Sequence, residues 1–127
     1  MQKVQKEIKK YQDERGWDKL LPGDLAKSIS IEAAELLENF QWDNPELSAV
    51  LNDKERVEKI SNEVADVLIY AYSLCIELNL DVDEVIRKKL EKVKLKYPAH
   101  LMKDISKEPG TNSLYWKIKH DYRRKAD

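Results

Sequence analysis

Glycine and proline are scarce in this chain of 127 residues, which contains three glycines and four prolines. An average chain uses about 7% glycine and about 5% proline, and tight turns depend on the backbone angles of these two residues. A sandwich or barrel with many turns is therefore disfavoured. Glycine occurs only at positions 16, 23 and 110, so neither GxxxxGK[ST] nor GxGxxG can be written anywhere in the chain. Any nucleotide binding has to proceed without a glycine-rich phosphate loop.

Disulfides, long apolar runs and an excess charge are also lacking. Cys75 is the single cysteine, so it cannot form an internal disulfide. The most apolar run, residues 67–76, is shorter than the ~20 residues of a membrane-spanning helix, and the first ten residues are too charged for a signal peptide. The formal net charge of −1 gives no electrostatic reason to expect nucleic acid as a partner. We therefore expect a cytoplasmic protein with no membrane or nucleic-acid partner.

The spacing of apolar residues predicts an all-α protein with four helices and a different C-terminal tail. We expect helices over about residues 4–15, 24–42, 54–78 and 81–97, with Asp24 as the N-cap of the second. The third helix is apolar nearly all round between residues 64 and 76, although a small monomer needs only one apolar stripe per helix. The bundle is therefore expected to be completed by a second subunit.

The tail, residues 98–127, carries seven Lys+Arg and four Asp+Glu, whereas residues 1–97 carry 16 and 20. A turn is expected at residues 108–111, followed by an aromatic segment, residues 114–122, which could form a short helix or a strand. This tail is either an appendage packed on the bundle or a basic lip over an anionic ligand.

Acidic side chains occupy positions where the helical pattern calls for apolar ones. The apolar stripe of the second predicted helix runs through residues 25, 29, 36 and 40, and Glu32 occupies the position that completes it. Glu35 lies at the edge of the same face. Glu63 and Asp66 flank the apolar stripe of the third predicted helix, together with Tyr70. Two helices thus each present an acid pair with i, i+3 spacing beside the core.

Such pairs are often simple surface charges, but these lie beside the core rather than opposite it. Four carboxylates brought together raise one another's pKa unless a cation neutralises them. Oxygen ligands without His or Cys favour Mg²⁺, with Mn²⁺ as a substitute, and Mg²⁺ keeps positions open for phosphate oxygens. A di-iron carboxylate site would need Glu-x-x-His pairs, and neither His100 nor His120 follows a Glu at that spacing. The pattern therefore suggests a magnesium site for phosphate chemistry.

Four ordered sequence blocks resemble the MazG-like, all-α nucleoside triphosphate pyrophosphohydrolases, and in particular their dCTP-pyrophosphatase-like branch. The blocks are Glu-Arg-Gly-Trp at 14–17, the segment 25–42 with Glu32-Ala-Ala-Glu35, the segment 63–70 with Glu63-Val-Ala-Asp66, and Lys-Tyr-Pro at 96–98. The resemblance covers about residues 4–98. It implies a MazG-like domain over residues 1–98 and a C-terminal extension over residues 99–127.

The resemblance also implies an activity and a set of site residues. The activity is Mg²⁺-dependent hydrolysis of a (deoxy)nucleoside triphosphate to the monophosphate and pyrophosphate, with dCTP or a modified pyrimidine dNTP as candidates, in nucleotide pool house-cleaning. Residues with catalytic and metal-binding roles would be Glu32, Glu35, Glu63 and Asp66. Substrate-binding residues would be Trp17, Trp42, Tyr70, Lys89 and Lys96.

Alternatives remain for these roles. A tryptophan at a helix end also suits core packing, and lysines on a Lys-rich helix are commonly solvated. Family members often carry Asn just before the second helix and at the position of Val93, and this chain lacks both, which leaves base and sugar preference open. The protein could also be a nucleotide-sensing oligomer without turnover, or a helical interaction module. The resemblance further suggests a homodimer or a homotetramer.

Overall fold

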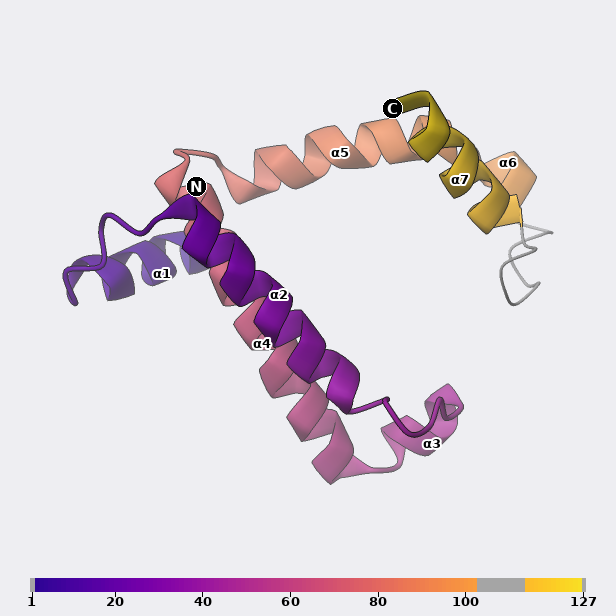
Figure 1. The fold of residues 1–127 in the computed structure, drawn as a ribbon, viewed down its shortest axis with the longest axis horizontal. Coiled ribbons are helices and arrows are strands. Elements are labelled where there is room, and N and C mark those ends of the chain that lie inside the picture. The colour runs from indigo at the N-terminus through magenta and orange to yellow at the C-terminus, as the bar shows by residue number, and fades with distance from the viewer. Residues whose placement is uncertain (1, 103–113, 127) are drawn as a thin grey trace. The chain divides into compact units, whose positions relative to one another are not determined.

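The structure is a computed structural model that describes residues 2–102 and 114–126, and within those ranges it contains seven α-helices and no strand (Figure 1). The helices are α1 (Lys3–Asp13), α2 (Pro22–Glu38), α3 (Leu47–Leu51), α4 (Lys54–Glu77), α5 (Val82–Lys96), α6 (Ala99–Met102) and α7 (Leu114–Ala126). The all-α prediction is confirmed. The chain divides into two compact units, Met1–Asp83 and Glu84–Asp127, and each is described by itself.

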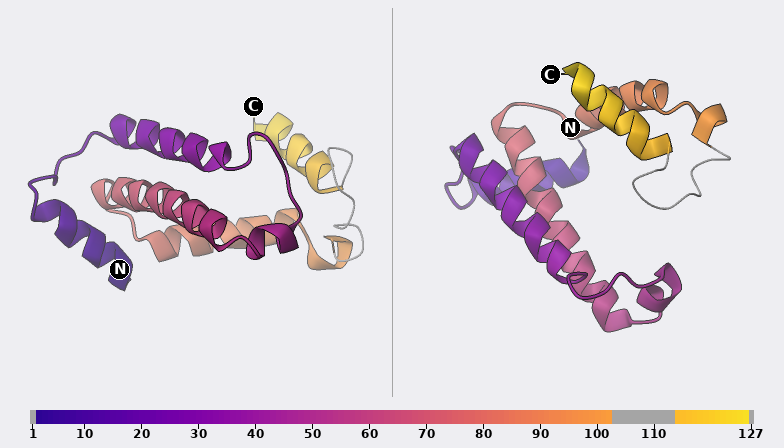
Figure 2. Two further views of the ribbon diagram at one scale, coloured as in Figure 1. Left: turned by 90° about the horizontal axis from the view of Figure 1, so that it is seen from below. Right: turned by 45° about the vertical axis from the view of Figure 1, so that its right-hand side comes forward.

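Helices α2 and α4 form the centre of the first unit and run antiparallel, side by side, as the views in Figures 1 and 2 agree. The predicted apolar stripe of α2 faces this contact, because Leu25 is buried and residues 29, 36 and 40 are half-buried. The predicted stripe of α4 also included residues 64 and 78. Residues 60, 67, 71 and 74 are half-buried, whereas Val64 and Leu78 are 37% and 49% exposed. The 3.6-residue period therefore identified the packed face of α2 and part of that of α4.

Buried polar side chains attach α1 to the rest of the first unit. The side chain of Gln5 is fully buried; its Nε2 donates to the carbonyl of Leu80 at 2.8 Å, and its Oε1 accepts from the backbone N–H of Val82 at 3.0 Å. Near the other end of α1, the side chain of Gln12 donates from Nε2 to Oγ of Ser73 at 2.7 Å. Two glutamines thus fix both ends of α1 against α4 and the turn that follows it.

Helix α2 begins and ends earlier than the sequence predicts. Its N-cap is Leu21 rather than Asp24, because Pro22 suits the first helical position, where its fixed φ and missing N–H are tolerated. Asp24 lies in the first turn, where its negative charge still favours the helix N-terminus. The helix ends at Glu38 with Asn39 as C-cap, so the prediction that it continues to Trp42 is wrong.

The other boundaries of the first unit follow recognisable local rules. Asp53 caps α4 by accepting from the backbone N–H of Arg56 at 3.1 Å. Gly16 after α1 and Asn79 after α4 adopt positive φ angles of 69° and 55°, conformations that glycine and asparagine tolerate best. The short helix α3 was not predicted. It lies in the segment that the sequence indicated only as a polar connection.

The second unit contains α6, α7 and α5 from Glu84 onward. Within this unit, Tyr97 stacks on Tyr115 of α7 with ring centroids 5.1 Å apart, and Lys96 Nζ lies 4.7 Å from the ring centroid of Tyr122. The aromatic part of the tail is therefore helical and contacts the end of α5. The turn predicted at residues 108–111 lies outside the described residues.

Helix α4 leaves much of its apolar surface uncovered, as its all-round apolar sequence predicts. Val64 is 37% exposed, Leu68 51% and Ile69 42%, while Ser73 is the buried residue of this helix. Among the described residues of the whole chain, the buried hydrophobic side chains are Leu25 and Val82. None of the described helices is both long enough and apolar enough to cross a membrane.

Candidate functional site

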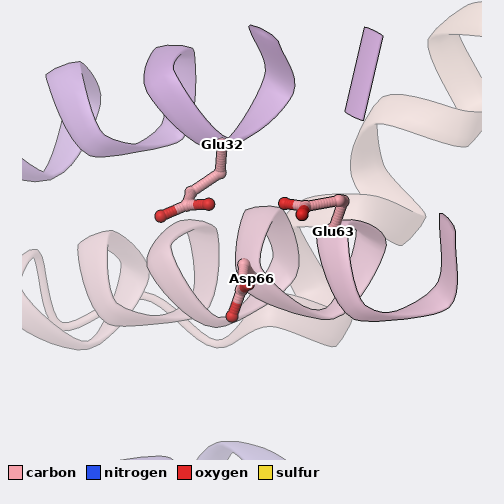
Figure 3. A group of neighbouring side chains, drawn as sticks. All are labelled: Glu32, Glu63 and Asp66. Carbon is pink, nitrogen blue, oxygen red and sulfur yellow. The ribbon is translucent and has the colours of Figure 1, made fainter. Parts of the chain in front are cut away.

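Three carboxylates from two helices converge between α2 and α4. Glu32 extends from α2 toward α4, and Glu63 and Asp66 come from α4, with one carboxylate oxygen of each lying within 4.8 Å of the others (Figure 3). Residues three apart lie on the same side of a helix, so the packing of α2 on this side of α4 brings Glu32 to the pair. Glu32 and Glu63 are half-buried and Asp66 is exposed.

The convergence perturbs the carboxylates electrostatically. Desolvation raises the pKa of Glu32, and the charges of Glu35, Asp66 and Glu63 and a hydrogen bond with Glu35 raise it further. Desolvation is also the largest cause that raises the pKa of Glu63, followed by the charges of Glu35 and Asp66. Glu35 itself is exposed and is not among the three converging oxygens, although its charge acts on both neighbours. The structure therefore brings together three of the four predicted ligands and places the fourth next to them.

The residues present fit a divalent cation. Oε2 of Glu63 is buried and has no hydrogen-bond partner, which is unfavourable for a charged oxygen unless a cation or another donor satisfies it. The donors of the cluster are all carboxylate oxygens, the ligand type that Mg²⁺ and Mn²⁺ prefer. Glu32, Glu63 and Asp66 are thus the residues that would hold such an ion, with Glu35 within reach of the same charge cluster.

A cavity of about 500 Å³ adjoins the acidic cluster within the first unit. Asp66 belongs to the cluster and also lines the cavity, as do the predicted substrate-binding residues Trp17 and Tyr70. We call it the aromatic cavity. The remaining lining residues come from α1, α2, α4 and the segment before α2. The apolar and aromatic ones are Val4, Ile8, Tyr11, Leu20, Leu25 and Ile69, and the polar ones are Glu7, Gln12 and Ser73. The volume is in the range of small-molecule pockets.

Sequence reasoning missed part of this cavity wall. The rings of Tyr11 and Trp17 meet edge to face, with centroids 5.9 Å apart, and Tyr11 belongs to the apolar spacing of the first helix, so periodicity could have placed it here. Gln12 and Ser73 had no comparable signal, because they are polar residues that are distant in sequence. Their contact depends on how α1 packs on α4.

The other predicted substrate-binding residues lie elsewhere. Trp42 is 90% exposed and follows the end of α2, and it does not line the cavity beside the acids. Lys89 and Lys96 belong to the second unit, where they line another cavity of about 380 Å³ together with Lys92 and Arg123. The substrate-binding roles of Trp42, Lys89 and Lys96 stay predictions.

The comparisons with known proteins identify the family of this all-α chain. The MazG-like family profile matches residues 27–111, so the chain belongs to the MazG-like family. The crystal structure of a pyrophosphatase from Archaeoglobus fulgidus is similar, with a TM-score of 0.64 and 39% sequence identity over 75% of this chain and 89% of that chain. The region that the family profile matches begins within α2 and extends beyond α5, so it includes both helices that carry the acidic cluster.

Curated relatives point to the same group of proteins. The chain is 31% identical to human dCTP pyrophosphatase 1 over 98 residues, which is 75% of this chain and 57% of that protein. It is 32% identical to the mouse dCTP pyrophosphatase 1 over 91 residues, 69% of this chain and 53% of that protein. The chain thus spans just over half the length of the curated relatives that it matches. The homology is to pyrophosphatases.

Proposed function

We propose that this protein hydrolyses a (deoxy)nucleoside triphosphate to the nucleoside monophosphate and pyrophosphate in a Mg²⁺-dependent reaction, as part of nucleotide pool house-cleaning. The observation that supports this most strongly is the convergence of Glu32, Glu63 and Asp66 beside an aromatic cavity. Converging carboxylate oxygens would bind the metal ion that accompanies a triphosphate, and the aromatic side chains of the cavity would contact the nucleobase. The homology to pyrophosphatases supports the same reaction.

The acidic residues would act as ligands and as electrostatic groups. Glu32, Glu35, Glu63 and Asp66 would hold the metal and keep the triphosphate oriented toward the cluster. A bound Mg²⁺ would neutralise the phosphate oxygens and acidify a coordinated water. Desolvation and neighbouring acids raise the pKa values of Glu32 and Glu63 in the absence of a cation, and a bound cation would favour the ionised forms that act as ligands.

The proposed reaction breaks one bond and forms another at the α-phosphorus. The oxygen of water bonds to the α-phosphorus, and the bond from that phosphorus to the α,β-bridging oxygen breaks, so pyrophosphate leaves. The proton released by the water passes to a carboxylate and then to solvent. Catalysis of phosphoryl transfer depends mainly on positioning the substrate and neutralising its charge. Both effects require that the carboxylates are already in position when the substrate binds.

The aromatic cavity would receive the nucleobase. Trp17 and Tyr70 line it together with Tyr11, and aromatic rings stack on any base, so these residues would supply affinity rather than selectivity. Asp66 belongs both to this cavity and to the acidic cluster, which would set the base and the phosphates of one nucleotide next to each other. The names of the curated relatives support dCTP as the candidate substrate, and a modified pyrimidine dNTP is the alternative that we propose beside it.

We further propose that the active form is a homodimer or a homotetramer. The exposed apolar residues of α4 support this, because Leu68 is 51% and Val64 37% exposed and neither lines the cavity beside the acids. Apolar side chains that gather on one exposed helix face are typical of a protein interface. A second copy of the chain would cover it.

The experiment that tests the proposed function is a panel of dNTPs with Mg²⁺, with products resolved by chromatography. We expect monophosphate and pyrophosphate, at a rate that falls by at least about a thousandfold in Glu63→Gln, the order of loss seen when one preorganised charge-stabilising group is removed. The matched control is Glu58→Gln, which alters an exposed acid on the same helix and should leave turnover intact. Nucleoside diphosphate and phosphate as products would contradict the proposed reaction. Binding without turnover would instead indicate a nucleotide sensor.

A further inference from the structure

Gln12 is a polar residue in the wall of the aromatic cavity, and it is 4% exposed. Its Nε2 donates to Oγ of Ser73 at 2.7 Å, and Ser73, which is 2% exposed, also lines the cavity. The Ser73 hydroxyl in turn donates to the backbone carbonyl of Ile69 at 2.8 Å. The three groups form a directed chain from α1 into the backbone of α4.

This chain fixes the orientation of the Gln12 amide. The single hydroxyl proton of Ser73 is used by the carbonyl of Ile69, so Oγ can only accept from Gln12. If the amide were rotated by about 180°, Oε1 of Gln12 would face Oγ of Ser73, and neither oxygen would have a proton to donate. The hydrogen bond therefore keeps Nε2 of Gln12 on Ser73, and Oε1 is the amide atom that points away from Ser73.

Oε1 of Gln12 is free to accept a hydrogen bond from a ligand. No donor to this atom is present among the described residues. Oε1 is not among the buried side-chain atoms without a partner in the described residues, which indicates that part of its surface is accessible to solvent. The open space that Gln12 lines is the aromatic cavity.

The other polar groups of the cavity are also rich in acceptors. Glu7 and Asp66 contribute carboxylates, which only accept while they are ionised, and Glu7 has an exposed ion pair with Lys3 at 3.9 Å. The hydroxyl groups of Tyr11 and Tyr70 can donate or accept a hydrogen bond, and the indole N–H of Trp17 can only donate one. A base with an exocyclic amino group presents two N–H donors at that position, and it therefore matches this wall better than a base with a carbonyl oxygen there.

We infer that Gln12, oriented by Ser73, is a specificity-determining residue that selects nucleobases with an exocyclic amino group over those with a carbonyl at the same position. Cytosine at C4 and adenine at C6 would donate to Oε1. Uracil and thymine at C4 and hypoxanthine at C6 would set two acceptors against each other. Buried groups built to pair with an N–H reject analogues that lack it, because the polar group of the site is then left unpaired.

This inference rests on the proposed function only in assuming that the cavity receives the base of a nucleotide. Binding of the product monophosphates tests it without turnover. Calorimetric titration with dCMP and dUMP, which differ at C4 and in the protonation of N3, gives the ratio of the two dissociation constants. The ratio of kcat/KM for dCTP and dUTP gives a second readout where turnover occurs. For the unaltered protein we expect both ratios to favour the cytosine nucleotide by at least about tenfold.

Two variants separate the role of the oxygen from the role of its orientation. Gln12→Met keeps the volume and removes the polar end, so the ratio should fall to about two or less. Ser73→Ala leaves the amide free to rotate and present its nitrogen, so dUMP should gain affinity relative to dCMP. Because Ser73→Ala removes only one oxygen, it decides the question if Gln12→Met does not fold by circular dichroism.

The matched control is Gln5→Met, the same substitution in the same helix at a buried glutamine that does not line the aromatic cavity. It should leave the dCMP to dUMP ratio within about a factor of two of the unaltered protein. Equal binding of dCMP and dUMP by the unaltered protein would overturn the inference, as would a ratio that survives both Gln12→Met and Ser73→Ala. A preference for dCMP that Gln12→Met abolishes, in a protein that turns over no triphosphate, would contradict the proposed function and support the inference.

Discussion

Glu32 and Glu63 lie on two antiparallel helices and bring carboxylate oxygens to within 4.8 Å of each other, with Asp66 as the third member. Both carboxylates are half-buried, and both have pKa values that desolvation and neighbouring acids raise. The packing of α2 on α4 therefore concentrates negative charge in a place where a simple helical bundle would have apolar side chains. Such an arrangement weakens the metal-free fold at neutral pH and favours cation binding.

Glu63→Gln is expected to stabilise the protein in the absence of metal. A carboxyl whose folded-state pKa is raised contributes most stability below its unfolded pKa of about 4.5, and this contribution is lost as the pH rises through the raised value. Glutamine resembles the protonated acid at every pH. In EDTA, the Tm of Glu63→Gln should therefore exceed that of the unaltered protein by an amount that grows between pH 4.5 and pH 7.5.

Added Mg²⁺ should reverse this order. The ion stabilises a protein by binding the folded state, so the unaltered protein should gain more in Tm than Glu63→Gln at the same concentration. Glu58→Gln, at an exposed position of the same helix, is the control and should follow the unaltered protein in both conditions. A Tm difference that is independent of pH in EDTA would contradict the electrostatic account of the cluster.

The ion pair of Arg56 and Asp43 should contribute stability that is lost in acid. Arg56 donates to both carboxylate oxygens of Asp43, at 2.7 and 2.9 Å, and to the carbonyl of Asn39 at 2.6 Å, so it connects α4 to the end of α2. Arg56 lowers the pKa of Asp43 below its usual value of 3.8, mainly through these hydrogen bonds. The stabilisation is therefore present above pH 3.8 and lost as the pH falls through the lowered pKa.

Asp43→Asn should accordingly lower the Tm at pH 7 and have a smaller effect near pH 2.5. Thermal melts followed by circular dichroism at both pH values measure this. Glu55→Gln provides the comparison, because the pair of Glu55 and Lys59 at 3.2 Å is exposed within one helix and should contribute little at either pH. Equal effects of the two substitutions at pH 7 would show that the bidentate pair has no special role.

Gln5→Met is expected to destabilise the protein by about 1–3 kcal/mol, the typical effect of leaving buried backbone polar groups unpaired. The substitution removes the partners of the Leu80 carbonyl and of the Val82 N–H, both at the turn between α4 and α5. Urea unfolding in EDTA gives the free energy of unfolding. Gln41→Met is the control at an exposed glutamine of the same unit. A change within ~0.5 kcal/mol for Gln5→Met, the usual range of surface substitutions, would contradict the role given to this buried glutamine.

Leu68→Glu should disrupt the proposed oligomer. Leu68 is 51% exposed on α4, so a glutamate there is tolerated in an isolated chain, but it sets unpaired charges within an apolar interface between two copies. Size-exclusion chromatography with light scattering should show a shift toward the monomer mass. Glu58→Lys, a charge change at an exposed polar position of α4, should keep the assembly. An unaltered protein that elutes as a monomer would exclude the proposed oligomer.

The sequence predicted the acidic cluster because the relevant signal is local. Glu32 interrupts an apolar stripe at a position that the 3.6-residue period defines, and Glu63 and Asp66 follow the i, i+3 rule on the next long helix. Both facts can be read within one helix each. That the two pairs converge was an interpretation of the sequence, and the structure does bring α2 and α4 into contact.

The features that were missed depend on contacts between distant segments. Gln12 and Ser73 are 61 residues apart, and neither carries a local sign that one will orient the other. Arg56 and Asp43 are closer, but their pairing requires α2 to end at Glu38 and the chain to turn back, which the predicted end at Trp42 did not allow. Periodicity identifies the faces of helices, whereas polar contacts between them need the packed structure.

The most direct test of the central claim is the fate of the oxygen from water during turnover. Hydrolysis of a dNTP with Mg²⁺ in water labelled with oxygen-18, followed by mass spectrometry of both products, identifies the phosphorus that is attacked. Attack at the α-phosphorus predicts one labelled oxygen in the nucleoside monophosphate and none in the pyrophosphate. Label in the pyrophosphate, or the release of labelled inorganic phosphate with a nucleoside diphosphate, would contradict the account.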